Sequence, residues 1–299
     1  MKSIKQVLFI INPVSGVNKK KDLGQQIETY FENEEIYPTI KYTQKAGDAH
    51  DFAKYAVKDG FDAVVVAGGD GTINEVVNGV GDSGIALGII PGGSGNGLAR
   101  HLGIPLKVSK ALSVIKDRVI QDIDVMDING KLSANVSGVG FDALVSHRFQ
   151  NKKKRGLSSY IKIIVKEFSS FKPFKYSLVV DGEEFEKEAF LISFANSSQF
   201  GNNTYISPDA SISDGYFDLC IVKPFPKIST PIIIQRLMMG SIDKDKHLEI
   251  IKAKEVVLKQ EIDIYHLDGD AIEGGKIIKV KIIPNGLRMI IPKNKLNRI

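Results

Sequence analysis

Glycine and small polar residues cluster directly after an apolar run in the segment Gly68-Gly69-Asp70-Gly71-Thr72, which follows residues 62–67. Glycine lets a backbone come close to a ligand, and the free N–H groups at the start of a helix can hold a phosphate. In such a turn Asp70 suits Mg²⁺ or a transferred proton, while Thr72 adds a hydroxyl donor. The segment therefore predicts a phosphate-binding turn.

The same arrangement recurs twice. Residues 91–97 (PGGSGNG) follow the apolar run 85–90, and a weaker case, residues 12–16 (NPVSG), follows the run 7–11. The carboxyl ends of parallel strands meet at one edge of an α/β sheet, where ligands bind. Three ordinary strand-to-helix turns are the alternative explanation. The Asp, Thr, Ser and Asn residues in all three turns favour a site that encloses a polyphosphate.

Other catalytic patterns are missing from the sequence. It has no Gly-x-x-x-x-Gly-Lys-Ser/Thr, no His-Glu-x-x-His and no Gly-x-Ser-x-Gly, and its five histidines lack metal-ligand spacing. Residues 138–143 (GVGFDA) match a dinucleotide pattern, but they lie in a strand-rich region, so we assign them no nucleotide. Cys220 is the single cysteine, which excludes an internal disulfide, and its apolar surroundings predict a buried strand position.

The elements that must position these turns alternate between strand and helix over residues 1–128. Apolar runs predict strands at 7–12, 39–43, 62–67, 85–90 and 119–128, and helical spacing predicts helices at 22–34, 48–58, from 73, 98–102 and 108–116. This alternation is typical of a parallel sheet with helices on both faces. We expect an α/β, doubly wound, Rossmann-like nucleotide-binding domain.

Strands dominate after Asn129-Gly130. We predict them at 132–136, 176–180, 188–195, 217–222, 255–259, 262–265, 276–283 and 287–291, with helices near 154–170 and 230–239. Asp181-Gly182 and Asn285-Gly286 predict hairpin turns. Residues 129–291 should therefore form an antiparallel β-sandwich, and residues 292–299 could pack back on the first domain.

The composition is typical of a globular protein and excludes few functions. The 299 residues are 43% hydrophobic and 25% charged, with a net charge of +5 that mildly favours anionic partners. No apolar run reaches the length of a membrane span, and the run 7–11 is too short for a signal peptide. We expect a cytoplasmic protein. No basic and aromatic platform for nucleic acid is visible.

With these motifs the sequence resembles the diacylglycerol kinase catalytic-domain family, which includes soluble bacterial lipid kinases and sphingosine and ceramide kinases. The resemblance covers nearly the whole chain. Its motifs are 12–16, 68–79 (GGDGTINEVVNG), 91–100 (PGGSGNGLAR), 196–210, 213–218 (SDGYFD) and 267–270 (LDGD). It implies an NAD kinase-like first domain, a β-sandwich second domain, and ATP- and Mg²⁺-dependent phosphorylation of a lipid hydroxyl.

The resemblance also implies residue roles. Asp70, Asp268 and Asp270 would be catalytic, with either Asp268 or Asp270 as the base. A structural Mg²⁺ would bind at Asp214 and at backbone oxygens near Ser211 and Tyr216. The residues implied in ATP binding are Asn12, Ser15, Thr43, Gly68, Gly69, Asp70, Gly71, Thr72, Asn74, Glu75, Gly93, Ser94, Gly95 and Asn96.

The sequence departs from the family pattern at two positions. Gly97 stands where bacterial diacylglycerol kinases usually have Asp, and this makes the second loop look more like that of sphingosine and ceramide kinases. The late motif ends in Asp270 rather than Glu, which shortens the arm of that carboxylate. Diacylglycerol, a sphingoid base and ceramide all stay open as acceptors.

The lipid substrate implies transient contact with a membrane surface, hence a peripheral location. Segment 148–175 has a basic run, Lys152–Arg155, followed by apolar residues, and it could contact an anionic membrane or form a solvated loop and a packed helix. Residues 224–239 are a second candidate for membrane contact, although we expect core packing there. The competing functions are an NAD kinase-like phosphotransferase and a non-catalytic nucleotide- or lipid-binding protein. A homodimer also stays open.

Overall fold

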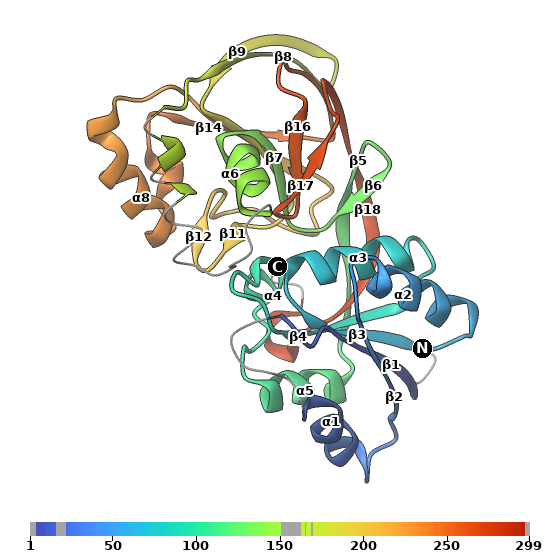
Figure 1. The fold of residues 1–299 in the computed structure, drawn as a ribbon. Helices are drawn as coiled ribbons and strands as arrows, with labels where there is room; N and C mark the ends of the chain where they lie inside the picture. Colours follow the sequence, from blue (N-terminus) through green and yellow to red (C-terminus); the bar gives the residue numbers. More distant parts are fainter. Residues whose placement is uncertain (1–3, 16–21, 151–162, 165, 169, 297–299) are drawn as a thin grey trace. The chain divides into compact units, whose positions relative to one another are not determined.

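The computed structural model describes residues 4–15, 22–150, 163–164, 166–168 and 170–296. The chain forms two compact units, Met1–Ile123 with Asn285–Ile299, and Asp124–Pro284. Figure 1 shows both units. Strand β5 (Ile120–Ile128), at whose end we expected the domain boundary, contributes residues to both units.

The sheet of the first unit has the order β2-β1-β3-β4 and continues into the last residues of β18, with these strands parallel to one another. Every residue of β3 and β4 is buried, as a sheet with helices on both faces requires. The strands are β1 (Gln6–Ile11), β2 (Tyr37–Tyr42), β3 (Ala63–Gly68), β4 (Ala86–Pro91) and β18 (Ile277–Ile290).

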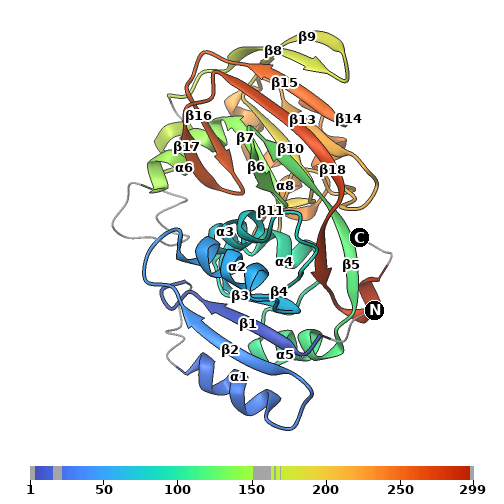
Figure 2. The same cartoon turned by 90° about the vertical axis from the view of Figure 1, so that its right-hand side faces the viewer.

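Helices cover both faces of this sheet. Helices α2 and α3 lie on one side of the strands, and α1 and α5 lie on the other (Figures 1 and 2). This confirms the doubly wound α/β prediction. The helices are α1 (Leu23–Phe31), α2 (Asp48–Lys58), α3 (Asp70–Val80), α4 (Gly97–His101) and α5 (Val108–Asp117), and η3 (Lys293–Lys295) follows β18.

The second unit is the expected β-sandwich. One layer is a six-stranded sheet in the order β14-β13-β10-β7-β16-β17, and the other combines β9, β8, β15 and the first part of β18. One buried cluster includes Phe217 from the first layer with Leu178 and Val256 from the second, so the core lies between the layers. The strands are β6 (Lys131–Ser133), β7 (Val136–Gly140), β8 (Phe174–Val180), β9 (Glu183–Ala189), β10 (Leu191–Ala195), β13 (Phe217–Val222), β14 (Leu248–Ala253), β15 (Glu255–Lys259), β16 (Ile264–Leu267) and β17 (Asp270–Glu273).

The remaining elements of this unit are short or helical. They are α6 (Phe141–Gln150), β11 (Gln199–Gly201), β12 (Thr204–Tyr205), η1 (Lys227–Ser229), α8 (Thr230–Met239) and η2 (Ile242–Lys244). Cys220 is fully buried in β13, as predicted. Among the described helices, none is both long and apolar enough to cross a membrane.

Several sequence-based expectations about elements were wrong. Asn285-Gly286 makes no hairpin: Asn285 has φ 52°, but β18 runs on through it, pairing first with β15 and then with β4. The single strands expected at 132–136 and 188–195 are each divided between two strands. Core packing of residues 224–239 holds for Ile233, whereas α8 leaves most of its apolar side chains exposed. The basic run 152–155 lies outside the described residues.

Candidate active site

Two of the glycine-rich turns touch through their backbones. A Cβ added to Gly93 would lie 2.6 Å from the Cα of Gly69, and one added to Gly69 would lie 3.2 Å from the Cα of Gly93. The N–H of Gly92 donates to the carbonyl of Gly68 at 2.8 Å. The turns after β3 and β4 therefore pack backbone against backbone, and a side chain at either glycine would push the two turns apart.

Asp70 joins these two turns. It is the first residue of α3, and its Oδ1 accepts the N–H of Gly97, the first residue of α4, at 2.8 Å. Gly97, where the sequence departs from the family pattern, thus contributes its backbone N–H. The carboxylate is held in place at the edge of the glycine surface.

Asn96 fixes the shape of the second turn. Its Oδ1 accepts the N–H of Gly93 at 2.8 Å, and its Nδ2 donates to the Gly93 carbonyl at 2.9 Å. Asn96 is buried and adopts the left-handed conformation (φ 52°, ψ 46°), which asparagine tolerates better than most residues. Ser94 stays exposed at the tip, and Gly95 accepts a hydrogen bond from Arg100.

The turn after β1 joins the same edge. The Nδ2 of Asn12 donates to the hydroxyl of Thr72 at 2.9 Å, and Ser15 donates to the Asn12 carbonyl at 3.0 Å. Thr43, buried just after β2, donates its N–H to Ile11. The structure thus brings all three predicted turns together, although Gly16 lies outside the described residues.

Two of the residues predicted to bind ATP, Glu75 and Asn74, make hydrogen bonds to residues of α2 and α3. Glu75 Oε2 accepts the N–H of Ala49 in the first turn of α2 at 3.2 Å, and Asn74 accepts from the amide of Asn78 one helical turn later. Gly71 is the second residue of α3. A role for these side chains in nucleotide binding stays a prediction.

In the second unit, Asp268-Gly269 forms the two-residue turn between β16 and β17. Both residues have positive φ, 48° and 94°, which suits a tight hairpin turn. The Asp268 carboxylate is buried and accepts from the Ser133 hydroxyl at 2.6 Å and from the N–H groups of Asn135 at 3.1 Å and Ala134 at 3.3 Å. Asp270, the first residue of β17, is exposed. The structure therefore gives the two acids different surroundings.

A buried histidine that the sequence analysis did not single out supports this turn. His266 Nε2 lies 3.0 Å from Asp142 Oδ2, and the N–H of Gly269 donates to His266 Nδ1 at 3.2 Å. Because Nδ1 accepts, the ring proton is on Nε2 and is donated to Asp142. The pattern at residues 138–143 could have pointed to Asp142, but we set it aside because of its strand-rich surroundings. In the structure these residues form the end of β7 and the start of α6, with Asp142 in the first turn of that helix.

Asp214, one of the residues predicted to hold a structural Mg²⁺, pairs with a lysine. Lys252 Nζ lies 2.5 Å from Asp214 Oδ2 and 3.8 Å from Asp218 Oδ1, and the N–H of Tyr216 donates to Asp214 Oδ1. The hydroxyl of Ser211 accepts the N–H of Ser213. Burial lowers the pKa of Lys252, but its hydrogen bond to Asp214 and the charges of Asp214 and Asp218 outweigh this and raise it. A structural Mg²⁺ at these residues stays a prediction.

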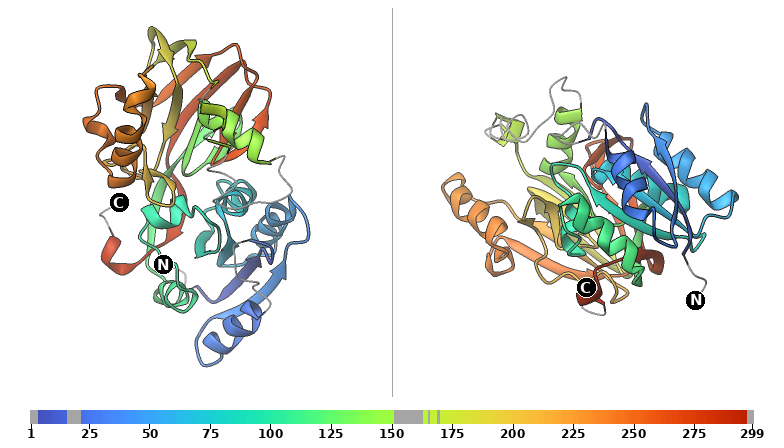
Figure 3. Two further views of the ribbon diagram at one scale, coloured as in Figure 1. Left: turned by 60° about the vertical axis from the view of Figure 1, so that its left-hand side comes forward. Right: turned by 90° about the horizontal axis from the view of Figure 1, so that it is seen from below.

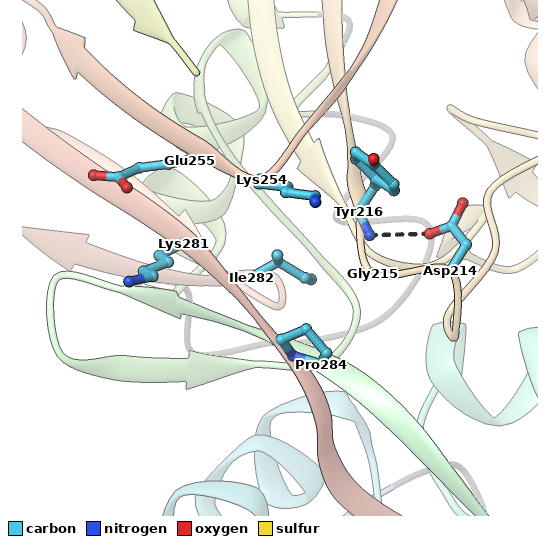
Figure 4. A pocket seen from close by; sticks show the side chains of 8 residues that line it. All are labelled: Asp214, Gly215, Tyr216, Lys254, Glu255, Lys281, Ile282 and Pro284. Atoms are coloured by element: carbon cyan, nitrogen blue, oxygen red, sulfur yellow. Dashed lines mark hydrogen bonds between the residues drawn. The ribbon is translucent and has the colours of Figure 1, made fainter. Parts of the chain in front are cut away.

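A cavity of about 310 Å³ lies beside residues 214–216 (Figure 4). Lys254 Nζ lies 4.8 Å from the centre of the Tyr216 ring. Acidic and basic side chains both line the cavity, and its lining includes none of the catalytic residues predicted from the sequence. The lining residues are Asp214, Gly215, Tyr216, Lys254, Glu255, Lys281, Ile282 and Pro284.

Comparison with known proteins places this site in a family. Residues 6–128 match the diacylglycerol kinase catalytic domain, and residues 135–291 match the YegS C-terminal NAD kinase beta sandwich-like domain. A diacylglycerol kinase of Bacillus subtilis is 31% identical, with 99% of both chains covered. A diacylglycerol kinase of Mycobacterium tuberculosis is also 31% identical, covering 83% of this chain and 84% of the relative.

Solved structures agree on the fold. The crystal structure of a diacylglycerol kinase from Bacillus anthracis has a TM-score of 0.74 and 23% identity, with 98% of this chain and 99% of that chain covered. The chain therefore belongs to the diacylglycerol kinase family of lipid kinases.

Proposed function

We propose that this protein transfers the γ-phosphoryl group of ATP to the hydroxyl of diacylglycerol in a Mg²⁺-dependent reaction. The observation that carries the proposal is the backbone contact between Gly69 and Gly93, with Asp70 joining the two turns. Phosphoryl transfer depends mainly on positioning and charge neutralisation. The joined turns and the N-terminus of α3 would position the phosphates, and Mg²⁺ at Asp70 would neutralise their charge.

The residues at the glycine turns suit ATP with Mg²⁺. The contact between Gly69 and Gly93 holds the two turns together, and glycine there lets the backbone come close to a phosphate. Mg²⁺ commonly binds one or two carboxylates together with substrate phosphates, and Asp70 offers a carboxylate there. When bound, Mg²⁺ would neutralise phosphate charge. Asn12 and Thr72 would orient the third turn toward the same phosphates.

For the proton acceptor we favour Asp268. In the reaction the lipid oxygen forms a bond to the γ-phosphorus, the bond from that phosphorus to ADP breaks, and the lipid hydroxyl proton passes to a carboxylate. The three donors to Asp268 hold the orientation of its carboxylate, and positioning dominates the rate of phosphoryl transfer. Exposed Asp270 would contribute negative charge nearby.

Diacylglycerol is the preferred acceptor because two relatives at 31% identity are named diacylglycerol kinase. A sphingoid base or ceramide remains the second candidate on account of Gly97. NAD is less favoured, since Gly93-Ser94-Gly95-Asn96 in the second loop resembles lipid kinases and the relatives are named as diacylglycerol or lipid kinases.

Paired variants separate the two acids. We expect Asp268→Asn to lower kcat for phosphate transfer by about a hundredfold or more and to lower the free energy of unfolding by about 2 kcal/mol, since an N–H would lose its acceptor. Asp270→Asn should leave stability unchanged within about 0.5 kcal/mol and reduce kcat less. Transfer assays and urea unfolding on both variants measure these effects. A stable Asp268→Asn protein with full kcat would assign the proton to Asp270.

A further inference from the structure

Helix α8 and the short η1 before it expose an apolar surface on the second unit. Only Ile233 of α8 is buried, at 7% exposed, and Leu237 packs partly buried against the neighbouring core cluster. The side chains that point outward are Ile228 (88% exposed), Ile232 (54%), Ile234 (47%), Met238 (63%) and Met239 (71%). We call these five residues the α8 surface.

No charged side chain interrupts the α8 surface within the helix. The exposed residues between its members are Pro231 and Gln235, and the one charge in α8, Arg236, lies half-buried in an ion pair with Asp245 at 2.7 Å. Figures 1 and 3 show α8 at the margin of the second unit. Contiguous apolar patches of this kind are uncommon on soluble monomers and mark surfaces that bind something.

Lysines border the α8 surface. Lys227 begins η1, while Lys244 and Lys246 are exposed in and after η2, a segment that contacts α8. Asp243 is exposed beside them, and Asp245 is already paired with Arg236. The border is therefore basic on balance, and it complements an anionic surface.

An apolar helical face with a basic border has the character of an interfacial membrane helix. Such a face lies along the bilayer, with apolar side chains below the headgroups and lysines at the phosphates. A second copy of the chain fits less well, because two-fold pairing of this face would bring like-charged borders together. The proposed acceptor, diacylglycerol, also resides in a bilayer, so the argument rests in part on the proposed function.

We infer that the α8 surface docks the protein on anionic lipid bilayers. The test is flotation of the full chain with vesicles of phosphatidylglycerol and phosphatidylethanolamine, without ATP or diacylglycerol. The double variant Ile232→Ser/Met239→Ser should bind these vesicles about tenfold more weakly. Ile277→Ser is the matched control, since Ile277 is 50% exposed on another face of the second unit and its replacement should change nothing.

A fluorescence measurement gives an independent readout, because the sequence contains no tryptophan. Met238→Trp should shift its emission to shorter wavelength when the anionic vesicles are added, whereas Ile277→Trp should not. Vesicles of phosphatidylcholine alone should produce a weaker shift, and added salt should reduce it, since lysines supply part of the attraction.

Three outcomes would overturn the inference: equal flotation of wild type and double variant, no vesicle binding by the wild type, or a wild-type dimer that the double variant loses. The last would assign the surface to a second copy. Urea unfolding of each variant verifies its fold. Flotation needs no turnover, so intact vesicle binding with no phosphate transfer would refute the kinase proposal alone, and transfer to micellar diacylglycerol without vesicle binding would refute docking alone.

Discussion

At the scale of single residues, the 268–270 turn depends on side chains far away in the sequence. His266 connects Gly269 to Asp142, and Ser133 and Asn135 hold the Asp268 carboxylate. Ser133 and Asn135 both donate to Oδ1 of Asp268, and His266 Nδ1 accepts the N–H of Gly269. We therefore regard His266 and Asp142 as positioning residues for Asp268, rather than groups that touch substrate.

Substitutions at Asp142 test whether the His266 ring needs only an acceptor oxygen at this position. Asn at this position keeps an oxygen that can accept the Nε2 proton of a neutral ring, so Asp142→Asn should cost about 1 kcal/mol of stability or less. Asp142→Ala leaves the buried Nε2–H without an acceptor and should cost about 2–3 kcal/mol, with a lower kcat and an unchanged KM for ATP. Unfolding and steady-state kinetics measure both.

The pair of variants shows whether an acceptor oxygen is enough or the carboxylate charge is needed to hold the ring. Equal losses in Asp142→Asn and Asp142→Ala would mean that the carboxylate charge is required. Loss of stability without loss of kcat would contradict the positioning role.

Residue chemistry was predicted better than residue contacts. The acids and glycines of the motifs stand out because their types and spacing are local properties of the sequence. The bond from Asp70 to Gly97 and those from Asp268 to residues 133–135 join segments that are distant in the chain. Only the folded structure reveals such partners. For the same reason, nothing in the sequence marked Lys252 as the partner of Asp214.

At the scale of elements, the two glycine turns act as one surface because their backbones touch. A methyl group on Gly93 would lie 2.6 Å from the Cα of Gly69, so one backbone must move, whereas the reverse contact is 3.2 Å and needs a smaller shift. We expect Gly93→Ala to cost about 1–3 kcal/mol of stability and to weaken ATP binding at least tenfold.

Gly69→Ala is the matched control for Gly93→Ala. It adds the same methyl group to the other side of the same contact and should cost less stability. Titration calorimetry with ATP and urea unfolding give the two readouts. A larger loss of stability in Gly69→Ala than in Gly93→Ala would show that this backbone contact does not set the shape of the site.

Predictions of elements succeeded where periodicity alone decides the structure. Helix α2 begins and ends where its apolar spacing indicated, and the buried runs became the central strands. They failed at Asn285-Gly286, because a positive φ at Asn285 is compatible both with a hairpin and with a strand that changes partners. For α8 the expectation of core packing was wrong for most of its apolar side chains, because an apolar helix looks the same in sequence whether it packs on a core or faces outward.

At the scale of the whole molecule, a buried histidine links stability to pH. Burial, and to a lesser degree the charge of Lys295, lowers the pKa of His101 to about 4. The unfolded chain binds this proton near pH 6.5, so between about pH 6.5 and pH 4 the unfolded state holds more protons and stability falls as the pH falls. From pH 7 to pH 5 the loss should be about 2 kcal/mol.

Urea unfolding at pH 7 and pH 5 measures this contribution. In His101→Gln the part of the pH dependence that comes from His101 should vanish. The same loss between pH 7 and pH 5 in His101→Gln and in the wild type would contradict the role of His101.

The central claim is that the joined glycine turns hold Mg²⁺–ATP for transfer to a lipid hydroxyl. The most direct test follows labelled phosphate from Mg²⁺–ATP onto diacylglycerol, sphingosine, ceramide and NAD, with the lipids in detergent micelles, for the wild type and Asp70→Asn. We expect label on diacylglycerol, reduced at least about a hundredfold in Asp70→Asn. Label on NAD alone, or no label on any acceptor despite measurable ATP binding, would contradict the claim.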